Sequence, residues 1–192
     1  MIHKNTPLKN ILELGEPCRC ERCENACKFG SGFLVEEDLE RIAKFLKISQ
    51  DKLKEKYLES QEKFHTTLWK PKTNKKDNLP FGQCVFFNPK KGCSIHEVKP
   101  LECRVAMNCK DYGEELIIWF HLNYFLNPND PESIRQYATY LKSGGKTLVG
   151  AQLEELVPDQ KELGKILKYE KLGYEQDWEE ILGIKGLIEE LK

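Results

Sequence analysis

The spacing of apolar side chains along the chain predicts a mainly helical protein. Residues 36–47 carry apolar side chains at intervals of three and four positions, the pattern of an amphipathic helix: Leu39, Ile42, Ala43 and Leu46. Residues 50–60 predict a second helix, for which Ser49 is a favourable N-cap. Residues 116–126 are so uniformly apolar and aromatic that we expect a buried helix there.

The end of the chain adds three more expected helices. Asp130 followed by Pro131 combines an N-cap with a proline in the first turn, and predicts a helix to about residue 142. Pro158 is expected to start the next helix, and residues 176–192 form the last one.

The middle of the chain predicts a small β-hairpin. Residues 64–69 have the composition of a strand that Pro71 ends, and residues 81–87 are its expected partner. The lysine-rich segment between them, residues 70–78, predicts a solvated hairpin tip.

Two segments rich in cysteine contain turn-forming residues, and their apolar residues show no regular helical or strand spacing. Residues 18–33 predict a loop, and residues 84–109 predict an irregular stretch with one short helical turn at 98–103. We therefore expect a mainly α fold with a small β-hairpin. It would comprise an N-terminal arm (1–17), an irregular cysteine-rich lobe (18–112) and a helical C-terminal region (113–192).

Composition and charge indicate which partners and which cellular compartment to expect. Charged residues make up 32% of the chain, but the formal net charge is only −1, so no overall field draws the protein to nucleic acid or to an anionic membrane. The longest apolar run, residues 116–120, is far shorter than the ~20 residues needed to cross a bilayer. The first residues show no signal-peptide core. We expect a soluble, cytoplasmic protein without a membrane or nucleic-acid partner, and leave a protein partner open.

Eight cysteines are unexpected in such a protein, because a reducing cytosol keeps thiols free unless something binds them. Disulfides are the alternative, but four of the cysteines crowd into residues 18–27, where pairing would close small, strained rings. We therefore predict that the cysteines bind metal. The candidate ligands are Cys18, Cys20, Cys23, Cys27, Cys84, Cys93, Cys103 and Cys109.

The spacing of the cysteines indicates a metal without identifying it. A C-x2-C pair, here Cys20 and Cys23, can turn two sulfurs toward one ion, and Cys27 can reach the same site from the next turn of the chain. Structural zinc sites typically use two such pairs, whereas iron–sulfur clusters accept a compact triple with a remote fourth ligand. We favour an iron–sulfur cluster, [4Fe–4S] in type, with zinc as the alternative. Eight thiolates suffice for one site or for two.

Two cysteine motifs resemble a known family. The first is C-E-R-C-x3-C, beginning at Cys20, and the second is G-C-S-I-H-E-V-K-P-L-E-C-R, from Gly92 to Arg104, with C-V-F-F at Cys84 before it. Together they are similar to the YkgJ-type cysteine-cluster proteins, which are described as zinc- or iron-chelating domains. The resemblance covers residues 18–109 and implies metal binding. A flagellin lysine N-methylase carries a similar cluster and provides an enzyme precedent.

The chain departs from the family pattern in both motifs. Where the family has two adjacent cysteines, this chain has Ala26 before Cys27, so one ligand is missing and Cys18 or Cys109 could replace it. Two other family residues, a tyrosine and an arginine, are replaced here by His96 and Lys99.

These observations favour a cysteine-ligated metal-binding protein whose site, in residues 18–112, is structural or electron-transferring. The first alternative is a modifying enzyme, methyltransferase-like, whose cluster supports catalysis. The second is a metal-handling module that acts through a partner protein. A pocket beside the cluster, lined by polar groups, would favour the enzyme.

Overall fold

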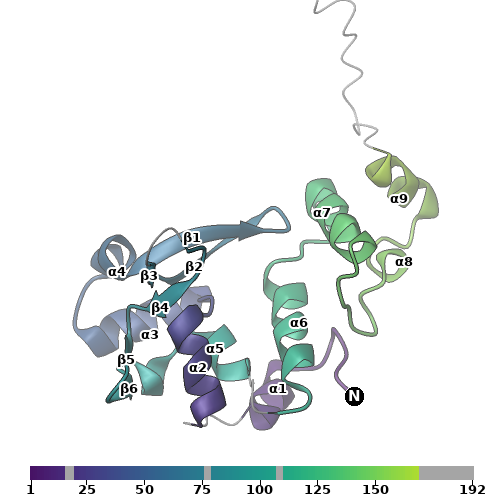
Figure 1. Ribbon diagram of the computed structural model, residues 1–192. Coiled ribbons are helices and arrows are strands. Elements are labelled where there is room, and N and C mark those ends of the chain that lie inside the picture. The colour runs from purple at the N-terminus through teal and green to yellow at the C-terminus, as the bar shows by residue number, and fades with distance from the viewer. Residues whose placement is uncertain (16–19, 76–78, 107–109, 169–192) are drawn as a thin grey trace, which may run out of the picture.

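The computed structural model describes residues 1–15, 20–75, 79–106 and 110–168, and this part of the chain is mainly helical (Figure 1). Its strands form three separate two-stranded antiparallel pairs. The expected class, mainly α with a small β-hairpin, is confirmed. The helix expected over residues 176–192 lies outside the described residues.

One hydrophobic core supports the cysteine-rich part of the molecule. Helix α3 (Glu36–Leu46) buries Leu39 and Ile42 there, as its apolar stripe predicts. Helix α4 (Gln50–Tyr57) adds Leu53, and the Ser49 hydroxyl caps it by accepting the Lys52 N–H at 3.2 Å. The described short strands are β3 (Thr73–Lys75), β4 (Gly82–Cys84), β5 (Phe87–Asn88) and β6 (Gly92–Cys93), and this core includes Cys84 and Phe87 with Cys93 packed against it.

A second core is formed mainly by the helices that follow. Helix α6 (Gly113–Tyr124) is buried along most of its length, as predicted, and α7 (Pro131–Lys142) starts at the expected cap, where the Asp130 carboxylate accepts the Glu132 N–H at 3.0 Å. The helix expected from Pro158 begins two residues later, because Asp159 is its cap. The remaining helices of this core are α1 (Leu8–Leu14), α5 (Leu101–Val105), α8 (Leu153–Leu156) and α9 (Gln160–Leu167). No helix among the described residues is long and apolar enough to cross a membrane.

The main hairpin differs from the expected one. Strand β2 (Thr66–Pro71) pairs with β1 (Leu58–Lys63), which precedes it. The helix expected over residues 50–60 therefore stops early, because residue 58 onward is extended and gains a pairing partner. Residues 82–84 of the expected partner strand form β4, which pairs with β3.

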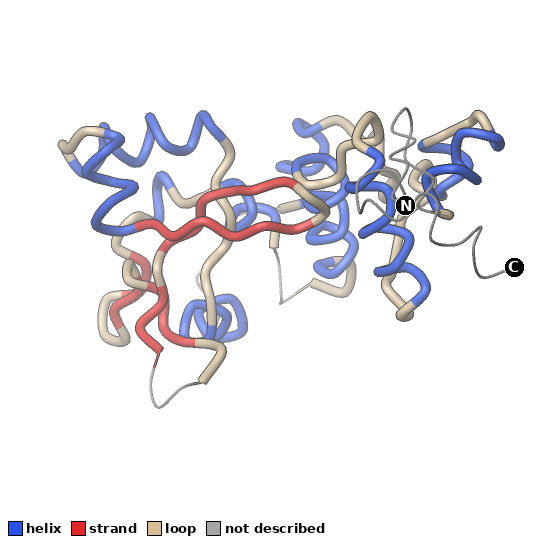
Figure 2. Tube along the Cα trace, turned by 90° about the horizontal axis from the view of Figure 1, so that it is seen from above, coloured by secondary structure: helices blue, strands red, loops and turns tan. Residues whose placement is uncertain are grey.

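The turn between β1 and β2 is held by contacts with α7. Its two residues, Phe64 and His65, both have left-handed backbone, with φ of 48° and 58°, a conformation that costs free energy outside glycine. Phe64 is only 5% exposed and packs edge-on against Tyr137. The His65 N–H donates to Gln136 Oε1 at 2.9 Å, and its ring Nδ1 lies 2.6 Å from Asp130 Oδ2. The hairpin thus links the cysteine-rich side to the helical side, which Figure 2 shows from above.

Candidate metal centre

A helix occupies much of the cysteine-rich segment, residues 18–33, where the sequence predicts a loop. Cys20 is the N-cap residue of α2 (Glu21–Phe29), and Cys23 and Cys27 stand four positions apart, on one face of it. None of the residues of this helix is buried, and its apolar stripe is short, formed by Cys23, Ala26 and Cys27, so hydrophobic periodicity is only a weak signal for it. Helix α2 packs against β4 and β6, and these strands carry the next two cysteines.

Backbone amides surround the sulfur of Cys84. This residue ends β4, and its sulfur accepts the backbone N–H groups of Phe86 and Phe87. The chain then turns through β5 into β6, where Cys93 lies opposite Phe87 in the pairing. Gly92, with φ of 77°, provides the left-handed residue that this tight turn requires. Such amide donors stabilise a thiolate that is bound to metal.

Cys103 approaches from the other side on α5, after a 3₁₀ turn (η1, His96–Val98). The backbone N–H of Gly32 donates to its sulfur. A Cβ atom at Gly32 would stand 2.6 Å from this sulfur, which is closer than any real contact. Only glycine therefore lets the chain pass Cys103 at this distance.

Four of the thiols lie close enough to affect one another. Burial raises the pKa of Cys84 to about 12 and that of Cys103 well above its usual value of 9.0. Burial also raises the pKa of Cys27, and the negative charge of Cys93 raises it further, although Lys99 opposes this. Charge on Cys27 acts in turn on Cys84 and Cys103. The structure thus brings together sulfurs from four separate segments.

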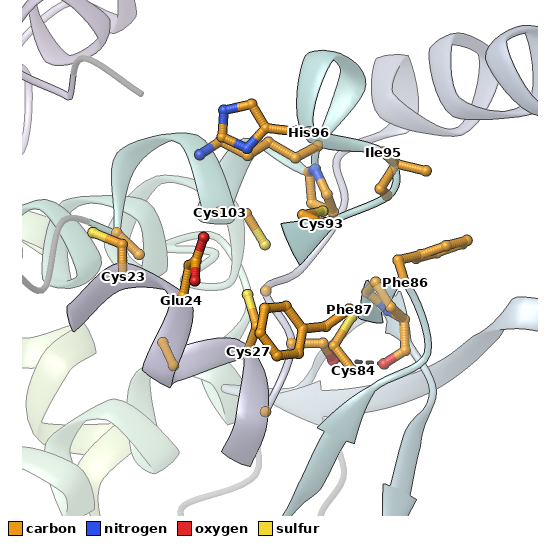
Figure 3. A pocket seen from close by; sticks show the side chains of 18 of the residues that line it. Cys23, Glu24, Cys27, Cys84, Phe86, Phe87, Cys93, Ile95, His96 and Cys103 are labelled. Atoms are coloured by element: carbon orange, nitrogen blue, oxygen red, sulfur yellow. Dashed lines mark hydrogen bonds between the residues drawn. The ribbon is translucent and has the colours of Figure 1, made fainter. Parts of the chain in front are cut away.

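The side chains of these four cysteines surround one space (Figure 3). The space is a cavity of about 310 Å³, with Phe86 and Ile95 among its apolar lining residues and Glu24, His96 and Lys99 among its polar ones. Five of the cysteines line it: Cys23, Cys27, Cys84, Cys93 and Cys103. In Figure 3, Cys23 lies to the side of the other four, beyond Glu24.

The remaining candidates are placed differently. Cys20 is described but does not line the cavity. Cys18 and Cys109 lie outside the described residues. No disulfide joins any two of the six described cysteines, which counts against the disulfide alternative among them. Within the described ranges, no three side chains of Cys, His, Asp or Glu stand together as a ready-made metal site.

A buried carboxylate fixes the segment that carries Cys103. Asp38 on α3 is 1% exposed, and its Oδ2 accepts the N–H of Leu101 at 2.7 Å and that of Val35 at 3.1 Å. Burial raises its pKa, which these hydrogen bonds and Arg41 oppose. The Arg41 guanidinium donates both to Asp38 and to the Lys99 carbonyl at 3.0 Å. This brace sets where α5 begins, and so where Cys103 lies.

Sequence reasoning did not single out Asp38, or Glu102 beside Cys103. Both are acidic residues near the start of a helix, where carboxylates are common, so no pattern marks them. Their burial, at 1% and 8% exposure, is visible only in the folded chain.

A comparison with family models matches residues 19–123 to the family CxxCxxCC, described as "Putative zinc- or iron-chelating domain". No curated protein and no solved structure matches the chain. The matched range covers more than half of the chain, and it contains the six described cysteines and the lining of the cavity. The match supports a metal-binding role, with zinc or iron as the metal. The chain belongs to the CxxCxxCC family of zinc- or iron-chelating domains.

Proposed function

We propose that this protein holds an iron–sulfur cluster in the cysteine-lined cavity, with Cys27, Cys84, Cys93 and Cys103 as its ligands. The observation that carries the proposal is the convergence of these four thiols, from four separate segments, on one cavity. Four sulfur ligands suit both [4Fe–4S] clusters and four-thiolate zinc.

The size of the cavity favours a cluster over a single ion. A four-thiolate zinc site is a closed tetrahedron with Zn–S distances of about 2.3 Å, which leaves little space between the sulfurs. The cavity of about 310 Å³ is far larger than the ~10–15 Å³ of accessible volume that a single water molecule needs. A group of several atoms would fill it better than one ion.

The surroundings of the cavity also suit a charged metal centre. A [4Fe–4S]²⁺ core or a Zn²⁺ ion with four thiolates has a net charge of about −2. The lysines Lys91 and Lys99 line the same cavity and would offset this charge. Hydrogen bonds from backbone N–H groups reach the sulfurs of Cys84 and Cys103 and would tune a reduction potential. The centre would be structural or electron-transferring, and the protein would bind and enclose it.

Anaerobic purification followed by metal and sulfide analysis tests the proposal. We expect a brown protein that contains iron and acid-labile sulfide in similar amounts. A colourless protein containing only zinc would overturn the cluster while keeping the metal site. Metal-free protein that takes up neither iron with sulfide nor zinc would overturn both.

Substitutions within α2 test the ligand set with a matched control. Cys27 and Cys20 lie at opposite ends of the same helix, but only Cys27 lines the cavity. We expect Cys27→Ser to lose most of the bound metal and Cys20→Ser to keep it. Cys23→Ser shows whether the fifth lining sulfur takes part. Loss of metal in Cys20→Ser together with full occupancy in Cys27→Ser would show that the proposed set is wrong.

A further inference from the structure

A buried carboxylate next to Cys103 is bound to the chain segment that contacts the same cysteine. Glu102 lines the cavity and is 8% exposed. Its Oε2 accepts the N–H of Phe33 at 2.7 Å, and its own N–H donates to the Phe33 carbonyl at 3.3 Å. These two hydrogen bonds hold residues 33 and 102 together.

The residue before Phe33 is Gly32, whose N–H donates to the Cys103 sulfur. The position of this N–H therefore depends on where Glu102 holds the neighbouring peptide. The space is narrow, because a Cβ at Gly32 would stand 2.6 Å from the sulfur. A small displacement of Glu102 would change the hydrogen bond at Cys103.

A histidine on the neighbouring helix fixes the second oxygen of Glu102. His121 lies on α6, and its Nε2 is 3.1 Å from Glu102 Oε1. Its Nδ1 is 2.9 Å from the Lys63 amine, at the end of β1. A protonated lysine amine can only donate, so Nδ1 accepts and the ring proton sits on Nε2. His121 therefore donates to Glu102, and Lys63 selects the tautomer that does so.

We infer that His121 is a positioning residue for the metal centre, acting through Glu102 and the Gly32–Phe33 peptide on the hydrogen bond to Cys103. The inference rests on the proposed function, because it assigns His121 an effect on the proposed cluster. Residues that orient metal ligands in this way typically contribute 10–100-fold to metal affinity. Hydrogen bonds to cluster sulfurs also set the electronic properties of the metal.

The ring of His121 also has a packing role, which the test must separate from its hydrogen bonds. Its ring lies edge-on to Phe125, with centroids 5.7 Å apart. His121→Phe keeps an aromatic ring there and removes both hydrogen bonds. His121→Gln retains a donor that can reach Glu102, and serves as the conservative variant. His65→Phe is the matched control, because His65 also pairs with a carboxylate, that of Asp130, but lies away from the cavity.

The first measurement uses metal-loaded protein. We expect His121→Phe to release metal to a chelator roughly 10–100-fold faster than the parent and to shift the sulfur-to-metal charge-transfer absorption. His121→Gln is expected to lie near the parent, and His65→Phe to match it in both readouts. Parental release and an unchanged absorption band in His121→Phe would overturn the inference.

A second measurement does not require metal. In the metal-free protein, the rate at which Cys103 is alkylated is expected to rise in His121→Phe and to stay unchanged in His65→Phe. If the parent binds no metal, the proposed function fails, and the alkylation rate still decides whether His121 positions Cys103. If His121→Phe does not fold, Lys63→Met tests the same chain of hydrogen bonds from its other end. An alkylation rate at Cys103 that neither variant changes would contradict the inference.

Discussion

The backbone N–H of Gly32 donates a hydrogen bond to the sulfur of Cys103, at a place where no side chain larger than hydrogen fits. The two residues are far apart along the chain, so their contact depends on how α5 is placed against the segment between α2 and α3. Cys103 can take part in the metal centre only while this close approach is kept.

Gly32→Ala is therefore expected to damage the site. Its Cβ would stand 2.6 Å from the Cys103 sulfur and 2.9 Å from the Cys103 nitrogen, so α5 would have to shift. We expect a loss of ~1–3 kcal/mol in the free energy of unfolding, the usual cost of overpacking, and reduced metal content. Gly164→Ala on α9 is the control, since a Cβ at Gly164 meets nothing within 4 Å and this residue does not line the cavity. Equal metal content in the two variants would contradict the expectation.

The brace at Asp38 makes a second prediction. Asp38→Ala leaves the N–H groups of Leu101 and Val35 without their acceptor, and each buried donor that loses its partner costs ~1–3 kcal/mol. We expect a lower free energy of unfolding in urea, with faster alkylation of Cys103, because the start of α5 is released. Glu40→Ala, an exposed position on the same helix, should change neither quantity. If the two variants behaved alike, the brace would have no role in placing α5.

Part of this fold could be predicted from the sequence, because some segments carry a strong local signal. Helices α3, α6 and α7 combine an apolar period with suitable first residues, and their tertiary contacts agree with that local preference. Helix α2 has only a short apolar period, formed by Cys23, Ala26 and Cys27, and none of its residues is buried. Its cysteine spacing of three and four residues was the available signal.

The β1–β2 turn and the supports of the site could not be predicted in this way. A two-residue turn with left-handed backbone normally contains Gly or Asn, and here Phe64 and His65 adopt it because α7 holds both. Asp38 and Glu102 gain their roles only through burial and through partners distant in sequence. Local patterns carry no information about such partners.

The pair of His65 and Asp130 predicts a dependence of stability on pH. The hydrogen bond from His65 to Asp130, together with the charge of Asp130, raises the pKa of His65 above 6.5. Burial acts to raise the pKa of Asp130, but the hydrogen bonds from His65 and from the backbone of Glu132 and Ser133 lower it below 3.8. The negative charges of Glu62 and Glu132 also raise the pKa of His65.

The sign of the effect follows from these two shifts. The contribution of the pair is complete between the ordinary pKa values of 3.8 and 6.5. It is lost as the pH rises through the raised pKa of His65, and also as the pH falls through the lowered pKa of Asp130. Asp130→Asn keeps a good N-cap for α7 and removes the charge.

The measurement compares unfolding of the parent and of Asp130→Asn in urea. We expect the free energy of unfolding of the parent to exceed that of Asp130→Asn by more at about pH 5.5 than at about pH 8.5. These two values lie on either side of the ordinary histidine pKa. In the Asp130→Asn background, His65→Phe should remove the pH dependence of the free energy of unfolding that His65 still contributes. A difference that is the same at both pH values would show that the pair contributes no charge interaction.

The contact between the hairpin and the helical core can be tested at Phe64. This side chain is 5% exposed and lies 5.4 Å and 5.6 Å, centroid to centroid, from the rings of Tyr137 and Tyr140. Truncation of a buried phenylalanine to alanine typically costs 3–5 kcal/mol, and here it also removes the contact that compensates the left-handed backbone. We therefore expect Phe64→Ala to lower the free energy of unfolding by ~3–5 kcal/mol.

Phe29→Ala provides the comparison, because Phe29 is 53% exposed and meets only the edge of the Phe81 ring among the aromatic contacts of the described residues. Its truncation should cost about 1 kcal/mol or less. Hydrogen exchange would locate the effect: amides of β1 and β2 near the turn should exchange faster in Phe64→Ala, while those of α3 stay protected. If protection of the hairpin stayed at the parental level, the turn would be stable without its contact with α7.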